Sequence, residues 1–183
     1  VENGVGVVLE VNSETDFVAK NDEFLQFVSD VAKQINVNNP ADVDALLASA
    51  YTQGGTVSEA LAEQIYKIGE KISIRRFERY ETTGHVSSYI HMGGKIGVLM
   101  SFDVDGIDPT SAEFVAYGRD VAMQVAAMSP VAPNRDAVPA DVVAKEMEIY
   151  KAPAAASGKP ENIQEKIATG RLEKYYAENC LTE

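Results

Sequence analysis

The feature that most constrains the fold is an internal repeat with a period of about ninety residues. Each copy has a short β-branched apolar segment typical of a strand, and then an apolar face with helical spacing. The first copy has its strand at residues 6–11 and its helix face from Phe24 to Ile35. The second has its strand at 97–102 and its helix face from Phe114 to Met128. The sequence therefore predicts two strand–loop–helix units of one design, the second opened by a Thr110–Glu113 capping box.

Further elements lie between and after the two copies. An amphipathic pattern over residues 57–68 predicts a helix, and Thr56 with Glu59 can form its capping box. Segments 72–80, 85–92 and 95–103 are predicted to be three successive strands of an antiparallel meander. Two more helices are predicted after Pro130, around residues 142–150 and from Pro160. This pattern predicts an α+β fold of two repeated subdomains, each a small antiparallel sheet with packed helices, plus a projecting helical arm.

The repeat also sets the expected domain organisation. We expect an N-terminal core subdomain over residues 1–84 and a C-terminal core subdomain over residues 85–183. The helix from about residue 160 has a narrow apolar stripe, which favours one arm of a helical hairpin. Because the chain stops just after this arm, we expect the hairpin to be truncated. The start at Val1 favours a piece of a longer protein.

Composition excludes several classes of function. The 183 residues include 28 acidic and 16 basic side chains, for a formal charge of −12. Nucleic-acid binding relies on cations placed against phosphates, so neither nucleic acid nor an anionic membrane surface is an expected partner. Apolar runs fall far short of the ~20 residues of a membrane span. The single cysteine, Cys180, favours a reducing compartment. A protein partner or a small ligand remains.

Catalytic and metal-binding motifs fail on inspection. The carboxylates of Asp103–Asp108 resemble a calcium loop, but Phe114 stands where a bidentate Glu is required. His85 and His91 lie about 20 Å apart along an extended strand, too far to share one ion. Gly93–Lys95 lacks the Ser or Thr of a phosphate loop. We therefore expect no enzyme activity, no cofactor and no metal.

The segment Ser13–Phe24 is the best candidate for function, because it joins a strand to a long helix where binding residues are often presented. Phe17 can be a hydrophobic staple on that helix, or an aromatic offered to a partner beside the carboxylate of Asp16. A third interpretation, an unrecognised acidic enzyme, needs Glu14 and Asp16 to act as a carboxylate pair.

Several motifs follow one another in order along essentially the whole chain. They are Thr15–Phe24, Lys67–Phe77, Ser88–His91, Lys95–Leu99, Val121–Ala127, Ser157–Pro160 and Glu165–Arg171. Together they resemble the elongation factor Ts family, whose members are guanine-nucleotide exchange factors for elongation factor Tu. This resemblance implies a factor that promotes GDP release during translation elongation, with two related subdomains and a helical hairpin.

The resemblance also implies partner-binding residues. Asp16 and Phe17 match the pair that inserts beside the magnesium-binding region of the G domain of elongation factor Tu. Ile96 and Gly97 match a strand-start pair that touches the partner. Gln124 stands where many members have a histidine that presses on the G domain. This departure removes a titratable imidazole but keeps a side chain of similar reach. The neighbouring Met123 is expected in the core.

The family architecture includes parts that we expect outside this chain. A small N-terminal helical domain is expected before Val1, and the rest of the hairpin with a last strand after Glu183. Homodimers occur in the family. The expected location is the bacterial cytoplasm or an organelle matrix. The alternative function is an exchange-inactive core that acts as a protein-binding or structural module.

Overall fold

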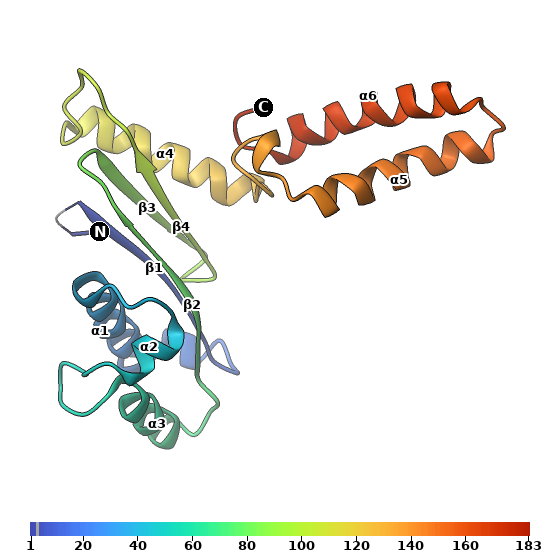
Figure 1. Ribbon diagram of the computed structural model, residues 1–183. Helices are drawn as coiled ribbons and strands as arrows, with labels where there is room; N and C mark the ends of the chain where they lie inside the picture. Colours follow the sequence, from blue (N-terminus) through green and yellow to red (C-terminus); the bar gives the residue numbers. More distant parts are fainter. Residues whose placement is uncertain (3) are drawn as a thin grey trace. The chain divides into compact units, whose positions relative to one another are not determined.

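The computed structural model describes residues 1–2 and 4–183 (Figure 1). In this part of the chain there are six α-helices, two short 3-10 helices and four strands. The elements in order are β1 (Val5–Asn12), η1 (Val18–Lys20), α1 (Asp22–Asn38), α2 (Val43–Ala48), α3 (Val57–Ile68), β2 (Ser73–Glu81), β3 (His85–His91), β4 (Ile96–Phe102), α4 (Ala112–Met128), η2 (Arg135–Ala137), α5 (Ala140–Ala156) and α6 (Glu161–Asn179). The predicted α+β class with small antiparallel sheets is confirmed.

The four strands form two separate two-stranded antiparallel sheets, β1 with β2 and β3 with β4. The predicted three-stranded meander is therefore wrong. The amide of Thr82 donates to Gly4 O at 3.2 Å, so the chain stays paired with the β1 side to the end of β2. Only then does it cross, through residues 82–84, to the second sheet.

The two predicted strand–loop–helix units are present. β1 leads through residues 13–21 into α1, and β4 leads through residues 103–111 into α4. The two loops have the same length, and the two helices have 17 residues each. The element order confirms the repeated design, and close superposition of the two units stays a prediction.

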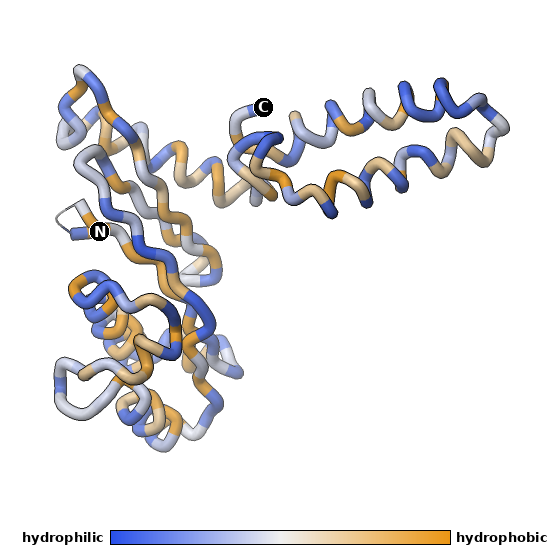
Figure 2. Tube along the Cα trace, in the orientation of Figure 1, coloured by the Kyte–Doolittle hydropathy of each residue, from blue (hydrophilic) through white to orange (hydrophobic). Residues whose placement is uncertain are grey.

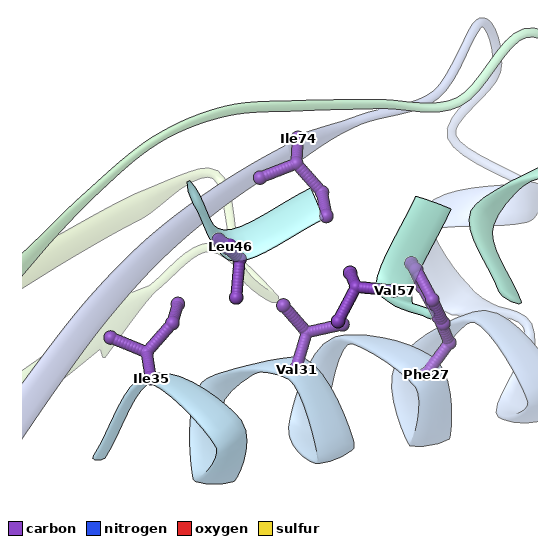
Figure 3. Packing of buried hydrophobic residues seen from close by; sticks show 6 residues of the cluster. All are labelled: Phe27, Val31, Ile35, Leu46, Val57 and Ile74. Carbon is purple, nitrogen blue, oxygen red and sulfur yellow. The ribbon is translucent and has the colours of Figure 1, made fainter. Parts of the chain in front are cut away.

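The first core lies between α1, α2, α3 and the β1–β2 sheet. Figure 3 shows side chains from these helices and from β2 pointing toward one another. Its buried members are Phe27, Val31, Ile35, Leu46, Val57 and Ile74. The predicted capping box is confirmed, because Thr56 and Glu59 hydrogen-bond reciprocally at the start of α3.

The second helix of the repeat uses small residues at its interface. α4 buries Gly118, Ala122 and Ala126, and Ala122 and Ala126 share a core cluster with Val98 of β4. A Cβ added at Gly118 would lie 2.3 Å from Ser87 Oγ, so this helix approaches the sheet too closely for larger side chains. Tyr117, which belongs to the apolar helix face predicted from Phe114 to Met128, is exposed.

The start of α4 also differs from the prediction. The hydroxyl of Ser111 accepts a hydrogen bond from the Phe114 amide at 3.3 Å, as an N-cap residue does. Thr110, predicted to cap this helix, instead donates its hydroxyl to Asp108 at 2.7 Å. The predicted Thr110–Glu113 capping box is therefore wrong, because Ser111 takes the capping role and Phe114 follows it at the third helical position.

The two sheets approach each other at two glycines that are equivalent in the repeat. A Cβ at Gly6 would lie 2.5 Å from Val86 Cγ1 and 2.6 Å from Leu99 Cδ1. A Cβ at Gly97 would lie 3.0 Å from Val8 Cγ2. Because positions 6 and 8 of β1 meet positions 99 and 97 of β4, the two strands run in opposite directions where they pack. The end of β1 is thus brought to the start of β4.

The chain divides into two compact units, residues 1–126 and residues 127–183. The predicted subdomain boundary at residue 84 falls inside the first unit and stays a prediction. None of the helices in the described residues is long and apolar enough to cross a membrane.

The second unit is a helical hairpin in which α5 packs against α6. Both helices alternate hydrophilic and hydrophobic colour along their length in Figure 2. Tyr176 and Cys180 of the α6 end share a core with Ala132 and Val138. The expectation of a truncated hairpin with one unpaired arm from about residue 160 is therefore wrong, because the second arm is α5 and precedes α6.

Candidate partner-binding site

The loop after β1 is a defined backbone structure. The Thr15 carbonyl accepts from the Ala19 amide at 3.2 Å, and the Phe17 carbonyl accepts from the Lys20 amide at 3.2 Å. Asn21 then caps α1, since its side-chain oxygen accepts from the Glu23 and Phe24 amides. The loop thus has a fixed path from strand to helix.

Phe17 and Val18 occupy opposite environments in this loop. Val18 is buried in a core cluster with Phe24 and Ile72. The Phe17 side chain is 89% exposed. The staple interpretation of Phe17 is therefore wrong, because Val18 makes the apolar contact with the start of α1. The exposure of Phe17 agrees with the other alternative, an aromatic side chain that is available to a partner.

Two carboxylates join this loop to the turn between α3 and β2. Glu70 accepts from the Thr15 amide at 3.0 Å and from the Thr15 hydroxyl at 2.6 Å. Glu14 accepts from the Lys71 amide at 3.2 Å. The segments that exchange these hydrogen bonds are 55 and 57 residues apart in sequence.

Asp16 connects the loop to the second sheet. Lys95 Nζ lies 3.2 Å from Asp16 Oδ2, and both side chains are largely exposed. Lys95 directly precedes β4, so this ion pair forms where the end of β1 meets the start of β4. Ile96, the next residue in the sequence, begins β4.

Ile96 and Gly97 both have packing roles in the free protein. Ile96 is half-buried against the cluster that α4 covers. Gly97 lies at the close approach to Val8 described above. Their predicted contact with a partner stays a prediction, and packing alone accounts for both residue types.

Gln124 lies on the outer face of α4. Its neighbours Ala122 and Val125 face the cluster on β4, whereas Gln124 itself is exposed. Within the described residues, no hydrogen bond or ion pair joins Gln124 to the Phe17 loop. Met123 is 43% exposed, so its predicted place in the core is wrong.

The sequence model of the Elongation factor TS family matches residues 14–183, from the Phe17 loop to the end of the chain. The chain belongs to the elongation factor Ts family. The matched region includes both helices of the hairpin, β2, β3 and β4, whereas β1 precedes it.

Relatives named "Elongation factor Ts" support this membership. The protein from Clostridioides difficile (strain 630) is 46% identical over 182 residues, which covers 100% of this chain. The proteins from Halothermothrix orenii and Trichlorobacter lovleyi are 46% and 48% identical and cover 97% of the chain. The chain spans 59%, 59% and 58% of the lengths of these three relatives.

The structure adds residues around the Phe17 loop that sequence reasoning missed. Glu70 and Lys95 contact it, but nothing local in the sequence pairs them with Thr15 or Asp16. Two apolar side chains at the end of β3 and just after it are also exposed, Ile90 by 62% and Met92 by 63%. Exposure of this kind requires the structure, because Ile90 lies in a strand whose apolar residues were expected to pack.

The other titratable groups are not gathered into one site. Glu14 and Asp16, the carboxylate pair of the enzyme interpretation, contact different partners, Lys71 and Lys95. His85 Nε2 lies 3.0 Å from Ser87 Oγ, and His91 Nδ1 lies 2.9 Å from the Tyr89 hydroxyl. Among the described residues, no group of three or more His, Cys, Asp or Glu is placed to hold a metal ion.

Proposed function

We propose that this chain is the core of a guanine-nucleotide exchange factor that promotes GDP release from elongation factor Tu during translation elongation. Membership of the elongation factor Ts family supports the proposal. The observation that carries it is the large exposure of Phe17 on a loop with a fixed backbone. A large exposed aromatic on a braced loop is a good anchor for a protein interface.

The proposed contact lies in the G domain of elongation factor Tu, near its magnesium and nucleotide site. Phe17 enters this region, and burial of its ring gains about 1.5–3 kcal/mol. The displaced partner elements then hold magnesium and GDP less well. No covalent intermediate, cofactor or metal of this chain takes part, so the proposed activity is binding and not enzymatic catalysis.

Thermodynamic linkage fixes the reciprocal behaviour. If the factor lowers the affinity of the partner for GDP, GDP lowers the affinity of the partner for the factor by the same ratio. Rebinding of GTP then releases the factor. Asp16, Ile96, Gly97 and Gln124 are the further proposed contacts. The formal charge of −12 suits a protein partner.

A second candidate function is an exchange-inactive core that binds a protein or acts as a structural module. The observation that favours it is the coverage of only 58–59% of the relatives' lengths. The two candidates differ in whether bound GDP and the chain exclude each other on the partner.

Calorimetry with nucleotide-free elongation factor Tu tests the proposal. We expect saturable binding that becomes much weaker when GDP is added. Binding that GDP leaves unchanged would favour the structural module, and no binding would refute the exchange function. Sedimentation of the free chain in the same buffer tests the homodimer that the family resemblance allows. A location in the bacterial cytoplasm or an organelle matrix is part of the proposal, since translation elongation takes place in both.

A further inference from the structure

Glu70 owes its position to the way α3 ends. Gly69 follows the helix with φ of 77°, a left-handed conformation that favours glycine. Nothing lies within 4 Å of a Cβ built at Gly69, so the requirement is conformational and not one of space. The turn at Gly69 carries Glu70 out of the helix and toward the loop after β1.

The Glu70 carboxylate satisfies two donors of one residue. The Thr15 amide and hydroxyl both donate to it, at 3.0 and 2.6 Å. Hydrogen bonds to a charged acceptor are shorter and stronger than neutral ones. The Thr15 hydroxyl oxygen also lies 3.4 Å from the Val18 amide, which donates to it. Glu70 therefore fixes Thr15, and Thr15 in turn is tied to Val18.

Phe17 lies between these two fixed points. Val18 is held in the core on one side, and Thr15 is held by Glu70 on the other. The ring itself makes no contact that would keep it in place, since it is 89% exposed. Its direction depends on the backbone of residues 15–18. Ordering this backbone before binding removes an entropic cost from the binding step.

We propose that Glu70 is a positioning residue for Phe17. Glu70 holds the aromatic ring of Phe17 outward in the free protein. The inference rests on the proposed function, because the ring is positioned for the nucleotide-exchange partner. Glu70 acts through Phe17 and the backbone of its loop, without touching the partner. Glu14, which accepts from the Lys71 amide, braces the same two segments from the opposite direction.

The test measures GDP release from elongation factor Tu with the full chain and its variants. Glu70→Ala is expected to lower the acceleration of GDP release about tenfold, as small misplacements of positioned groups do. Glu70→Gln keeps one acceptor oxygen and is expected to fall between wild type and Glu70→Ala. Glu63→Ala is the matched control. It removes a carboxylate that pairs with Lys67 on the same helix, and it is expected to leave GDP release unchanged.

The decisive comparison repeats Glu70→Ala in a Phe17→Ala background. If Glu70 acts through Phe17, its removal has no further effect there. An equal loss in both backgrounds would show that Glu70 acts independently of the ring, and would overturn the inference. The inference would also be overturned if Glu70→Ala, with Phe17 present, accelerated GDP release from elongation factor Tu as much as wild type does.

Amide hydrogen exchange provides a readout that does not depend on the partner. Glu70→Ala is expected to speed exchange at the Thr15 amide while amides inside α1 stay protected. Unchanged protection at Thr15 would refute the bracing itself. The proposed function would be refuted if the wild-type chain did not accelerate GDP release from elongation factor Tu while Glu70→Ala still sped amide hydrogen exchange at Thr15. The role of Glu70 would then fall with it, although the bracing would stand.

Discussion

Phe17 and Val18 show how one loop divides two tasks between adjacent apolar residues. Val18 is buried and anchors the loop to the start of α1. Phe17 forgoes the gain of about 1.5–3 kcal/mol that a buried ring would give. The folded chain does not use this side chain for packing, so its effect on stability and its effect on a partner are separable.

Phe17→Ala tests this separation. We expect the unfolding free energy to change by less than about 0.5 kcal/mol, since surface substitutions rarely do more. We expect the acceleration of GDP release to fall about thirtyfold, which corresponds to roughly 2 kcal/mol for an interface hot spot. Thermal melting and a GDP-release assay measure the two effects.

Phe27→Ala is the matched control, because Phe27 is 2% exposed in the first core. Its cost in stability is expected to be about 3–5 kcal/mol. If Phe17→Ala were destabilised to a similar extent and still accelerated GDP release from elongation factor Tu normally, the assignment of Phe17 to the interface would be wrong.

For single residues, the sequence could identify the Phe17 loop but not the residues from other segments that contact it. The Thr15–Phe24 motif pointed to Asp16 and Phe17 because it lies in one continuous segment. Glu70 is 55 residues from Thr15, and Lys95 is 79 residues from Asp16, so only the fold brings them together. Met123 was misplaced because α4 packs through small residues, which leave a weak periodic signal.

Among the elements, the contact between the two sheets depends on glycine. Gly6→Ala would place a Cβ within 2.6 Å of both Val86 and Leu99, whose side chains pack beside β1. We expect a loss of about 1–3 kcal/mol in unfolding free energy, as for overpacked cores. Chemical denaturation measures it.

Gly170→Ala is the control for the sheet prediction. Gly170 lies inside α6 with nothing within 4 Å of an added Cβ. Alanine is the better helix former there, so we expect a gain of roughly 0.5–1 kcal/mol. Equal effects of the two substitutions would contradict the close approach of the sheets.

The β1–β2 sheet carries a pH-dependent ion pair. A register shift after Glu10 lets two consecutive arginines reach one carboxylate, with Arg76 Nε at 2.6 Å and Arg75 Nη1 at 2.9 Å. The hydrogen bond from Arg76, aided by Arg75, holds the pKa of Glu10 below its ordinary value of 4.5. The charged form is therefore favoured by folding.

The sign of the pH effect follows from this lowered pKa. The stabilisation from Glu10 is fully present above pH 4.5 and is lost as the pH falls through the lower pKa of the folded state. We expect Glu10→Gln to be less stable than wild type at neutral pH, with the difference shrinking in acid. Chemical denaturation of wild type and Glu10→Gln between about pH 3 and pH 7 measures this difference in unfolding free energy. A difference that is independent of pH would contradict the ion pair.

Periodicity predicted which elements exist better than it predicted how they pair. α1 and α3 were identified from their strong apolar faces, and α3 also from its capping residues. The pairing of β2 with β1 was missed, because short loops favour neighbours in sequence whereas this sheet joins strands separated by three helices. α5 was predicted only in part, because its last turns contain Pro153 and several alanines and so lack an apolar periodicity.

At the scale of the whole chain, the α+β class and the repeat could be predicted, and the complete hairpin could not. The narrow stripe of α6 faces a single helix, α5, so a narrow stripe did not mean an absent partner. Family membership could be predicted because several long motifs occur in one order along the chain. The activity of this part of the factor depends on whether the Phe17 loop alone can weaken GDP binding.

The rate of GDP release from elongation factor Tu, measured with and without the full chain, tests this most directly. A fluorescent GDP analogue bound to the partner is displaced by excess GDP while the concentration of the chain is raised. We predict that release accelerates with concentration to a plateau, and that Phe17→Ala lowers the acceleration about thirtyfold. Release at the unassisted rate at every concentration, despite binding to the nucleotide-free partner, would contradict an exchange function of this core.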